Sequence, residues 1–185
     1  MPFNPGAVVD KGTSIIAVAE VTDAWALKTL TAGTNALLVG HVANSDISQT
    51  TSKTEYKDES GKTVASDFEY SLVTTGTLMQ TDKTTIDFMA ESVKSKYFLE
   101  YKYQGIKDGK KQEMFKVGQV TPQFKMTTPG NTSSMPYEFT GIYPTATVTF
   151  NSTHLAAIET ALSITIYCTG VSITASQGFV VKETV

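Results

Sequence analysis

Arginine is absent from this chain of 185 residues, and all fifteen of its positive side chains are lysines. Bidentate recognition of phosphate or carboxylate usually depends on the planar guanidinium group of arginine. The formal net charge of -3 and the pI of about 5.4 also leave no cationic field that would hold nucleic acid or an anionic lipid surface. Functions that depend on binding nucleic acid or anionic membranes are therefore disfavoured.

Residues with reactive or metal-ligating side chains are also scarce. The single cysteine, Cys168, excludes a disulfide framework, and the two histidines, His41 and His154, leave too few ligands for a zinc site. We expect Cys168 to be a small buried hydrophobe and both histidines to be surface or structural residues. Neither a nucleophile-elbow motif nor a glycine-rich phosphate loop occurs. These absences predict a protein without enzyme activity, cofactor, metal or small-molecule substrate.

The sequence has no apolar run of membrane-spanning length, and its first residues do not follow the pattern of a signal peptide. We therefore expect no membrane anchor, and a mature chain that starts near its first residue, inside a cell.

What the sequence does contain is typical of β-sheet: threonine is the commonest residue, and valine, isoleucine, tyrosine and phenylalanine are frequent. Apolar and polar residues alternate in five segments, which predict strands with one buried face. The segments are Phe68–Leu72, Tyr97–Tyr103, Tyr137–Phe139, Ala146–Phe150 and Ile164–Cys168. The pair Asp108-Gly109 predicts a type I′ hairpin turn, and residues 58–61 predict a second turn.

Two segments have helical periodicity instead. The stripe of Ile86, Met89, Ala90 and Val93 predicts a helix over about 84–95, with Thr81 or Asp82 as its cap. A weaker stripe of Leu155, Ile158 and Leu162 predicts a short helix over about 154–162, with Ser152 or Thr153 as its cap. The expected fold is mainly β, a β-sandwich or barrel-like arrangement of antiparallel sheets, with one flanking α-helix and a second short one.

The chain is expected to form one domain over residues 1–185. Within it, residues 67–150 form the core and residues 151–185 a C-terminal extension that packs on it. Residues 44–66 are rich in threonine, serine and charge, and large apolar residues are few there. This stretch is either an ordinary exposed hairpin or an arm that becomes ordered on a partner.

Paired carboxylates and a row of tyrosines offer the remaining chemistry. The pairs Asp58 and Glu59, Asp67 and Glu69, and Asp87 and Glu91 could serve a glycosidase, although solvated surface is the simpler interpretation. Asp87 and Glu91 would repel one another on one helix face, which suggests an oppositely charged neighbour, such as one on another subunit. The alternating tyrosines could stack on sugar rings, although packing in a core is favoured; they are Tyr97, Tyr101 and Tyr103.

The order of elements in the middle of the chain has a known counterpart. A charged hairpin leads into Leu72–Leu78, a capped helix follows, and two strands joined by the Asp-Gly turn span Tyr97–Val120. A proline-interrupted segment then precedes the strand YEFTG at Tyr137–Gly141. Over residues 44–150 this order resembles the tail tube (major tail) proteins of long-tailed bacteriophages, and it is similar to the tube subunits of contractile injection machines.

The resemblance implies a structural subunit that assembles into stacked, hexameric rings, in which inner strands join around a channel. It implies location in the tail of a virion, after synthesis in the cytoplasm of a bacterial host. Its partners would be copies of itself and other tail proteins, and DNA would pass through without specific binding. The arm would bridge rings. The candidate subunit contacts are Thr54, Glu55, Tyr56, Lys57, Asp58, Glu59, Asp87 and Glu91.

Three alternatives stay open at this point. The chain could be another virion β-protein, such as a capsid decoration or neck subunit. It could also be a carbohydrate- or surface-binding β-sandwich that uses exposed tyrosines. An enzyme is the third alternative, and it would be limited to carboxylate chemistry.

Overall fold

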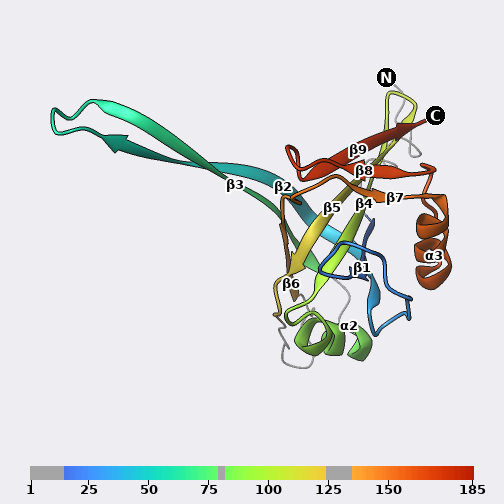
Figure 1. Ribbon diagram of the computed structural model, residues 1–185. Coiled ribbons are helices and arrows are strands. Elements are labelled where there is room, and N and C mark those ends of the chain that lie inside the picture. Colours follow the sequence, from blue (N-terminus) through green and yellow to red (C-terminus); the bar gives the residue numbers. More distant parts are fainter. Residues whose placement is uncertain (1–14, 79–81, 124–134) are drawn as a thin grey trace, which may run out of the picture.

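The chain folds around one large antiparallel sheet, which confirms the mainly β prediction (Figure 1). The computed structural model describes residues 15–78, 82–123 and 135–185, except the side chains of 40–45 and 68. The strands are β1 (Ile15–Val21), β2 (Ala36–Lys57), β3 (Thr63–Leu78), β4 (Tyr97–Lys107), β5 (Lys110–Val120), β6 (Met135–Gly141), β7 (Val148–Phe150), β8 (Val171–Ile173) and β9 (Phe179–Thr184). The helices are α2 (Lys83–Asp87), which continues into the π-helical turn η1 (Phe88–Ser92), and α3 (Ser152–Leu162).

The large sheet closes on itself. Its order is β4-β1-β2-β3-β6-β5-β9, and β4 also pairs with β5. The second edge of β5 is divided, because residues 118–120 pair with β6 and residues 111–116 pair with β9. At the division Gly118 faces Gly141, and a side chain on Gly118 would lie 2.0 Å from the carbonyl oxygen of Thr140. Glycine is therefore required where the sheet closes.

Closure gives the sheet two cores, one on each face. The enclosed core contains residues of β1, β2, β3, β4, β5 and β6, and Phe88, Met89 and Val93 of the helical segment cover one end of it. The outer core lies between β1, β4 and β5 on one side and α3, β7 and β8 on the other. Figure 1 shows α2 at one end of the strands and α3 beside them.

The second core corrects the expected character of one strand. Alternation in Tyr97–Tyr103 predicted a polar face that would be wet or partnered, yet Glu100 is 0% exposed and Lys102 is 5% exposed. Both side chains lie on the enclosed face of β4 along with Phe98, opposite the face of Leu99 and Tyr101. A closed sheet buries both faces of such a strand.

The two helices lie where periodicity predicts them, with different details. In the first, Asp82 is the cap and accepts a hydrogen bond from the backbone N–H of Thr85 at 2.7 Å. Met89 and Val93 are buried as expected, but Ile86 and Ala90 are only partly buried. The π-helical turn adds a residue to the turn, so that Thr85 and Phe88 take the inward positions instead.

The second helix buries its predicted stripe of Leu155, Ile158 and Leu162. Its cap is Asn151, not Ser152 or Thr153. The Asn151 side chain accepts from the backbone of His154, and the His154 ring accepts from the backbone of Asn151. His154 is therefore a structural residue in a capping box. His41 has no described side chain.

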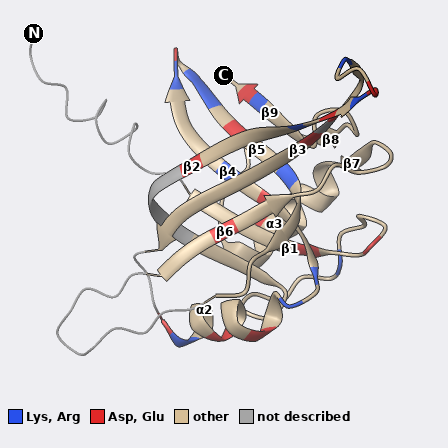
Figure 2. Cartoon of the chain, turned by 90° about the vertical axis from the view of Figure 1, so that its left-hand side faces the viewer, with Lys and Arg blue, Asp and Glu red and all other residues tan. Residues whose placement is uncertain are grey.

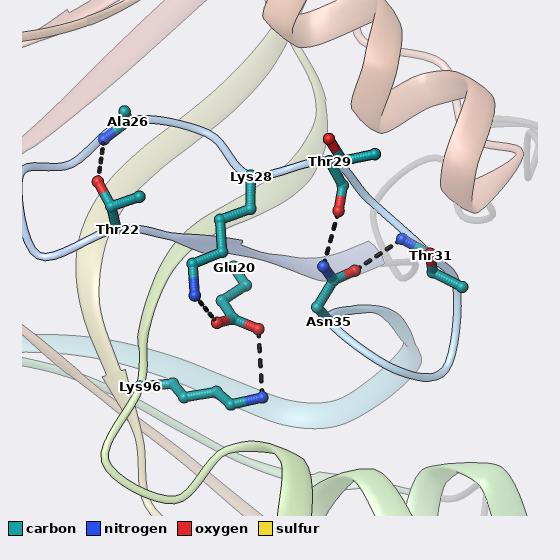
Figure 3. A network of polar contacts seen from close by, with 8 residues as sticks. All are labelled: Glu20, Thr22, Ala26, Lys28, Thr29, Thr31, Asn35 and Lys96. Atoms are coloured by element: carbon teal, nitrogen blue, oxygen red, sulfur yellow. Dashed lines mark hydrogen bonds and ion pairs between the residues drawn. The ribbon is translucent and has the colours of Figure 1, made fainter.

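A buried carboxylate positions the loop between β1 and β2 (Figure 3). Glu20 is 4% exposed, and its carboxylate accepts a hydrogen bond from Lys28 in the loop. It also forms an ion pair with Lys96, just before β4, with 3.3 Å between Oε2 of Glu20 and Nζ of Lys96. The Asn35 side chain closes the far part of the loop, because it donates to the carbonyl of Thr29 and accepts from the N–H of Thr31. Polar side chains thus order a segment that has almost no regular structure.

The predicted strand at Ile164–Cys168 does not form. Its alternation is present in the burial of Ile166, but its backbone N–H groups bind carboxylates rather than a neighbouring strand. Glu159 accepts from Ile166 at 2.7 Å, and Glu113 accepts from Tyr167 at 2.7 Å and from Cys168 at 2.9 Å. Because carboxylates satisfy these backbone donors, the segment does not need to pair with a neighbouring strand.

We expect Glu113→Gln to lower the free energy of unfolding by about 2 kcal/mol, within the range for a buried hydrogen-bonded charge. Glu113 is 0% exposed and also accepts from the Tyr101 hydroxyl at 3.0 Å. An amide would turn an N–H₂ group toward some of these donors. Urea unfolding measures the loss, and Glu59→Gln, the same change at an exposed position, is the control. A change below about 0.5 kcal/mol for Glu113→Gln would contradict this role.

Candidate interaction surface

The most unusual surface of the molecule is a two-stranded ribbon that extends away from the sheet (Figure 1). From here on, the arm means residues 50–71, which overlap the stretch 44–66 discussed above. Beyond Gln49 and Leu72, β2 and β3 pair only with one another, because β1 reaches β2 no further than His41 and β6 reaches β3 no further than Leu72. Both outer edges of the arm are therefore unpaired within the described part of the chain.

The arm carries almost no core of its own. With the exception of Ser66 and Ser71, which are partly buried, its described side chains are exposed. Tyr56 is 50% exposed, Val64 64% and Tyr70 52%. Near its base the arm is held to the body by Tyr143, whose hydroxyl accepts from Gln49 at 3.2 Å and whose ring lies 6.3 Å from that of Tyr70. An isolated ribbon of this kind is marginally stable in water.

The turn at the end of the arm is built by one aspartate. The Asp58 carboxylate accepts from the backbone N–H and hydroxyl of Ser60 and from the N–H of Lys62, at 2.6–3.0 Å. These hydrogen bonds lower the pKa of Asp58, that to the Ser60 side chain most of all. Gly61 has a φ of +82°, which suits glycine. The turn lies where the sequence predicts it. The strands that it joins, β2 and β3, are much longer than the segments 54–57 and 62–66 that the sequence pattern suggests.

The structure brings six of the eight predicted contact residues together at the far end of the arm; they are Thr54, Glu55, Tyr56, Lys57, Asp58 and Glu59. All six are exposed. The Glu55 carboxylate pairs with Lys53 and accepts from the Thr63 hydroxyl at 3.3 Å. Across residues 50–71 three lysines face five carboxylates, so that the arm has a net charge of -2.

Asp87 and Glu91 lie elsewhere, on the helical segment at one end of the sheet. Asp87 forms an ion pair with Lys83, and Glu91 forms one with Lys94 at 3.1 Å. Each carboxylate already has a lysine of its own chain, so the repulsion that suggested a neighbouring subunit is relieved locally. The expected oppositely charged neighbours are thus present in the same chain, and a subunit contact on the helix stays a prediction.

The enclosed core contains an ion pair that the sequence does not reveal. Lys116 and Glu100 are both 0% exposed, and their charged atoms lie 3.9 Å apart. Thr74 donates to Glu100 at 2.8 Å and accepts from Lys116, while the Tyr137 hydroxyl donates to Glu100 at 3.0 Å. These contacts join β3, β4, β5 and β6 across the enclosed space. Because every member has partners inside the protein, we interpret the network as a structural one.

Burial controls the titration of these groups. It raises the pKa of Glu100 above its ordinary value, and the charge of Lys116 opposes that rise. It lowers the pKa of Lys116 and of Lys102, and Glu100 opposes both shifts. It also raises the pKa of Tyr137. A carboxyl and two amines that are moved toward neutrality are typical of groups removed from water.

The remaining candidates for chemistry also have structural surroundings. Burial raises the pKa of the Cys168 thiol to about 11, so that it is protonated at neutral pH. Tyr101 is buried, and Tyr97 and Tyr103 pack against the outer core. This agrees with the favoured interpretation that these tyrosines pack in a core. Among the described residues, no group of three or more His, Cys, Asp and Glu side chains could hold a metal ion. No helix in the described part is long and apolar enough to cross a membrane.

No model of a known protein family matches the sequence, and a search of curated proteins finds no match either.

Proposed function

We propose that this protein is a structural subunit of a phage tail tube, which assembles into stacked rings around a channel for the genome. The observation that carries the proposal is the arm, which has exposed faces and two unpaired edges. Unpaired strand edges promote aggregation unless a partner covers them. A second copy of the chain would provide that cover.

The geometry of the arm favours assembly in one direction. The arm leaves one side of the body (Figure 1), and we propose that a different surface of a second copy receives it. Such head-to-tail contacts produce closed rings or open filaments rather than simple symmetric dimers. Rings that stack without a fixed limit are what a tube requires.

The distribution of titratable groups also supports a structural role. Glu20, Glu100 and Glu113 are the buried carboxylates among the described residues, and each is held by donors of its own chain. A surface without arginine and with a net negative charge is also compatible with a channel that does not retain DNA.

Purified protein at increasing concentration tests the proposal. We expect rings or filaments in negative-stain electron micrographs, and a sedimenting mass that increases with concentration. A particle that keeps the 20.0 kDa mass of one chain at the highest concentration reached would contradict the proposal.

A further inference from the structure

A cavity of about 280 Å³ opens on the body of the protein beside the outer core. It lies between the start of β1, strands β2 and β4, and the segment after α3, and its lining includes Ile15, Leu38, Tyr103, Ile164, Thr165 and Tyr167. Leu38 is 37% exposed and Tyr167 36%. A cavity of about 150 Å³ already accepts a benzene ring. The cavity therefore has room for one large aromatic side chain.

Lysines lie near this cavity, and one of them contacts a residue of its lining. The Lys111 ammonium lies 4.2 Å from the centre of the Tyr167 ring. Lys107 and Lys110 are in the adjoining β4–β5 turn, and Lys182 on β9 pairs in register with Glu113 of β5. Figure 2 shows lysines gathered at the tip of β4 and β5 and on β9. Residues 107–111 and β9 together contain these four lysines and two carboxylates, Asp108 and Glu183, and Glu183 pairs with Lys110 at 3.4 Å. The excess of lysine leaves a positive rim.

The far end of the arm has the complementary features. Tyr56 is a large, half-exposed side chain two residues before the turn. Residues 55–59 contain three carboxylates (Glu55, Asp58 and Glu59) and one lysine, Lys57, and Glu55 pairs with Lys53. Figure 1 shows that the arm leads away from the body of its own chain, whereas the β4–β5 turn and the C-terminus lie on the other side. Tyr56 therefore cannot enter the cavity of its own chain.

We propose that Tyr56 on the arm of one copy inserts into this cavity on the next copy, with the acidic end of the arm against the lysine rim. The inference rests on the proposed function and names the contact through which the subunits assemble. An exposed aromatic side chain that fills an apolar pocket, with charged groups around it, is the usual composition of an interface hot spot. Opposite charge at the rim would guide the arm into register.

Two variants test the two halves of the contact. Tyr56→Ala removes the inserted side chain without touching the body, and we expect it to raise the concentration needed for half-assembly by at least about 30-fold. Val64→Ala, which shortens another exposed apolar side chain of the arm, is the matched control and should assemble as the wild type does. Thr165→Trp fills the cavity from its exposed wall and should prevent assembly to the same extent. Leu38→Lys at the rim is a second cavity variant if Thr165→Trp does not fold.

Mixing the two defective proteins gives the decisive measurement. A cavity variant keeps a working arm and Tyr56→Ala keeps a working cavity, so the mixture can form one productive contact and no more. Sedimentation should then show a 1:1 heterodimer of about twice the 20.0 kDa chain mass, without rings. A mixture that stays monomeric, or a Tyr56→Ala protein that assembles normally, would overturn the inference. If wild type fails to assemble, the proposed function fails; if only these variants disagree, tail-tube assembly stands without this contact.

Discussion

Replacing residues 51–70 by a two-residue Asn-Gly turn is expected to abolish assembly and to leave the body folded. Thr50 and Ser71 face one another in the β2–β3 ladder, and a type I′ turn can join such a pair directly. The chain already uses this solution where Asp108 and Gly109, both with positive φ, join Lys107 to Lys110. The removed residues contribute nothing to either core among those described.

Two measurements check this result together. The melting temperature of the shortened protein should stay within about 5 °C of the wild-type monomer, because the loss is confined to the ribbon and the Tyr70–Tyr143 contact. Its sedimenting mass should stay at that of one chain where the wild type forms rings. An arm-containing protein with Asp108→Asn serves as the control for the Asn-Gly turn, since it should fold and assemble. Rings formed by the shortened chain would show that the arm is not needed.

Breaking the enclosed ion pair should cause the largest loss of stability. Lys116→Met leaves the Glu100 carboxylate buried without its cation, and removal of one partner of such a pair costs about 3–5 kcal/mol. The double variant Glu100→Gln with Lys116→Met removes both charges and retains an amide that can bond to Thr74 or Tyr137. We expect it to recover at least half of the loss in urea unfolding. A double variant as unstable as the sum of the two single variants would contradict this coupling.

The same pair predicts a pH dependence with a definite sign. Burial already raises the pKa of Glu100 in the folded protein above its ordinary value of 4.5, and loss of the Lys116 charge raises it further. Above pH 4.5 the unfolded chain then releases a proton that the folded chain keeps, so the stability of Lys116→Met falls as pH rises.

The double variant should lack this part of the pH dependence, since it has no carboxyl at position 100. Lys94→Met removes an exposed ion pair with Glu91 and is the control. Lys94→Met should change the free energy of unfolding by no more than about 0.5 kcal/mol at any pH at which Lys116→Met is measured.

Local sequence signals located part of the secondary structure, and they predicted no strand at β1, β8 or β9. Alternation identified parts of β3, β4, β6 and β7, the Asp-Gly pair identified the β4–β5 turn, and helical spacing identified both helices. These signals succeed because turn conformation and the spacing of buried side chains are properties of neighbouring residues. The same reasoning failed at Ile164–Cys168, because the donors there are satisfied by Glu113 and Glu159 rather than by another strand.

The candidate surface was only half accessible to such reasoning. The arm was visible as a stretch with little apolar residue content, and six of the predicted contact residues lie at its end. The cavity was not visible, because its lining comes from four separate segments that lie between residues 15 and 167 of the chain. The ion pairs of Asp87 with Lys83 and of Glu91 with Lys94 were missed as well, although the partners are only four and three residues apart in the chain.

Composition and short-range pattern thus sufficed for the β-rich class, the turns, the helices and a polar arm, because each depends on residues close together in the chain. Closure of the sheet, the second core and the enclosed Glu100–Lys116 pair depended on which strands meet. Strand pairing between distant segments is chosen by the joint burial of many side chains, and no local window contains that information.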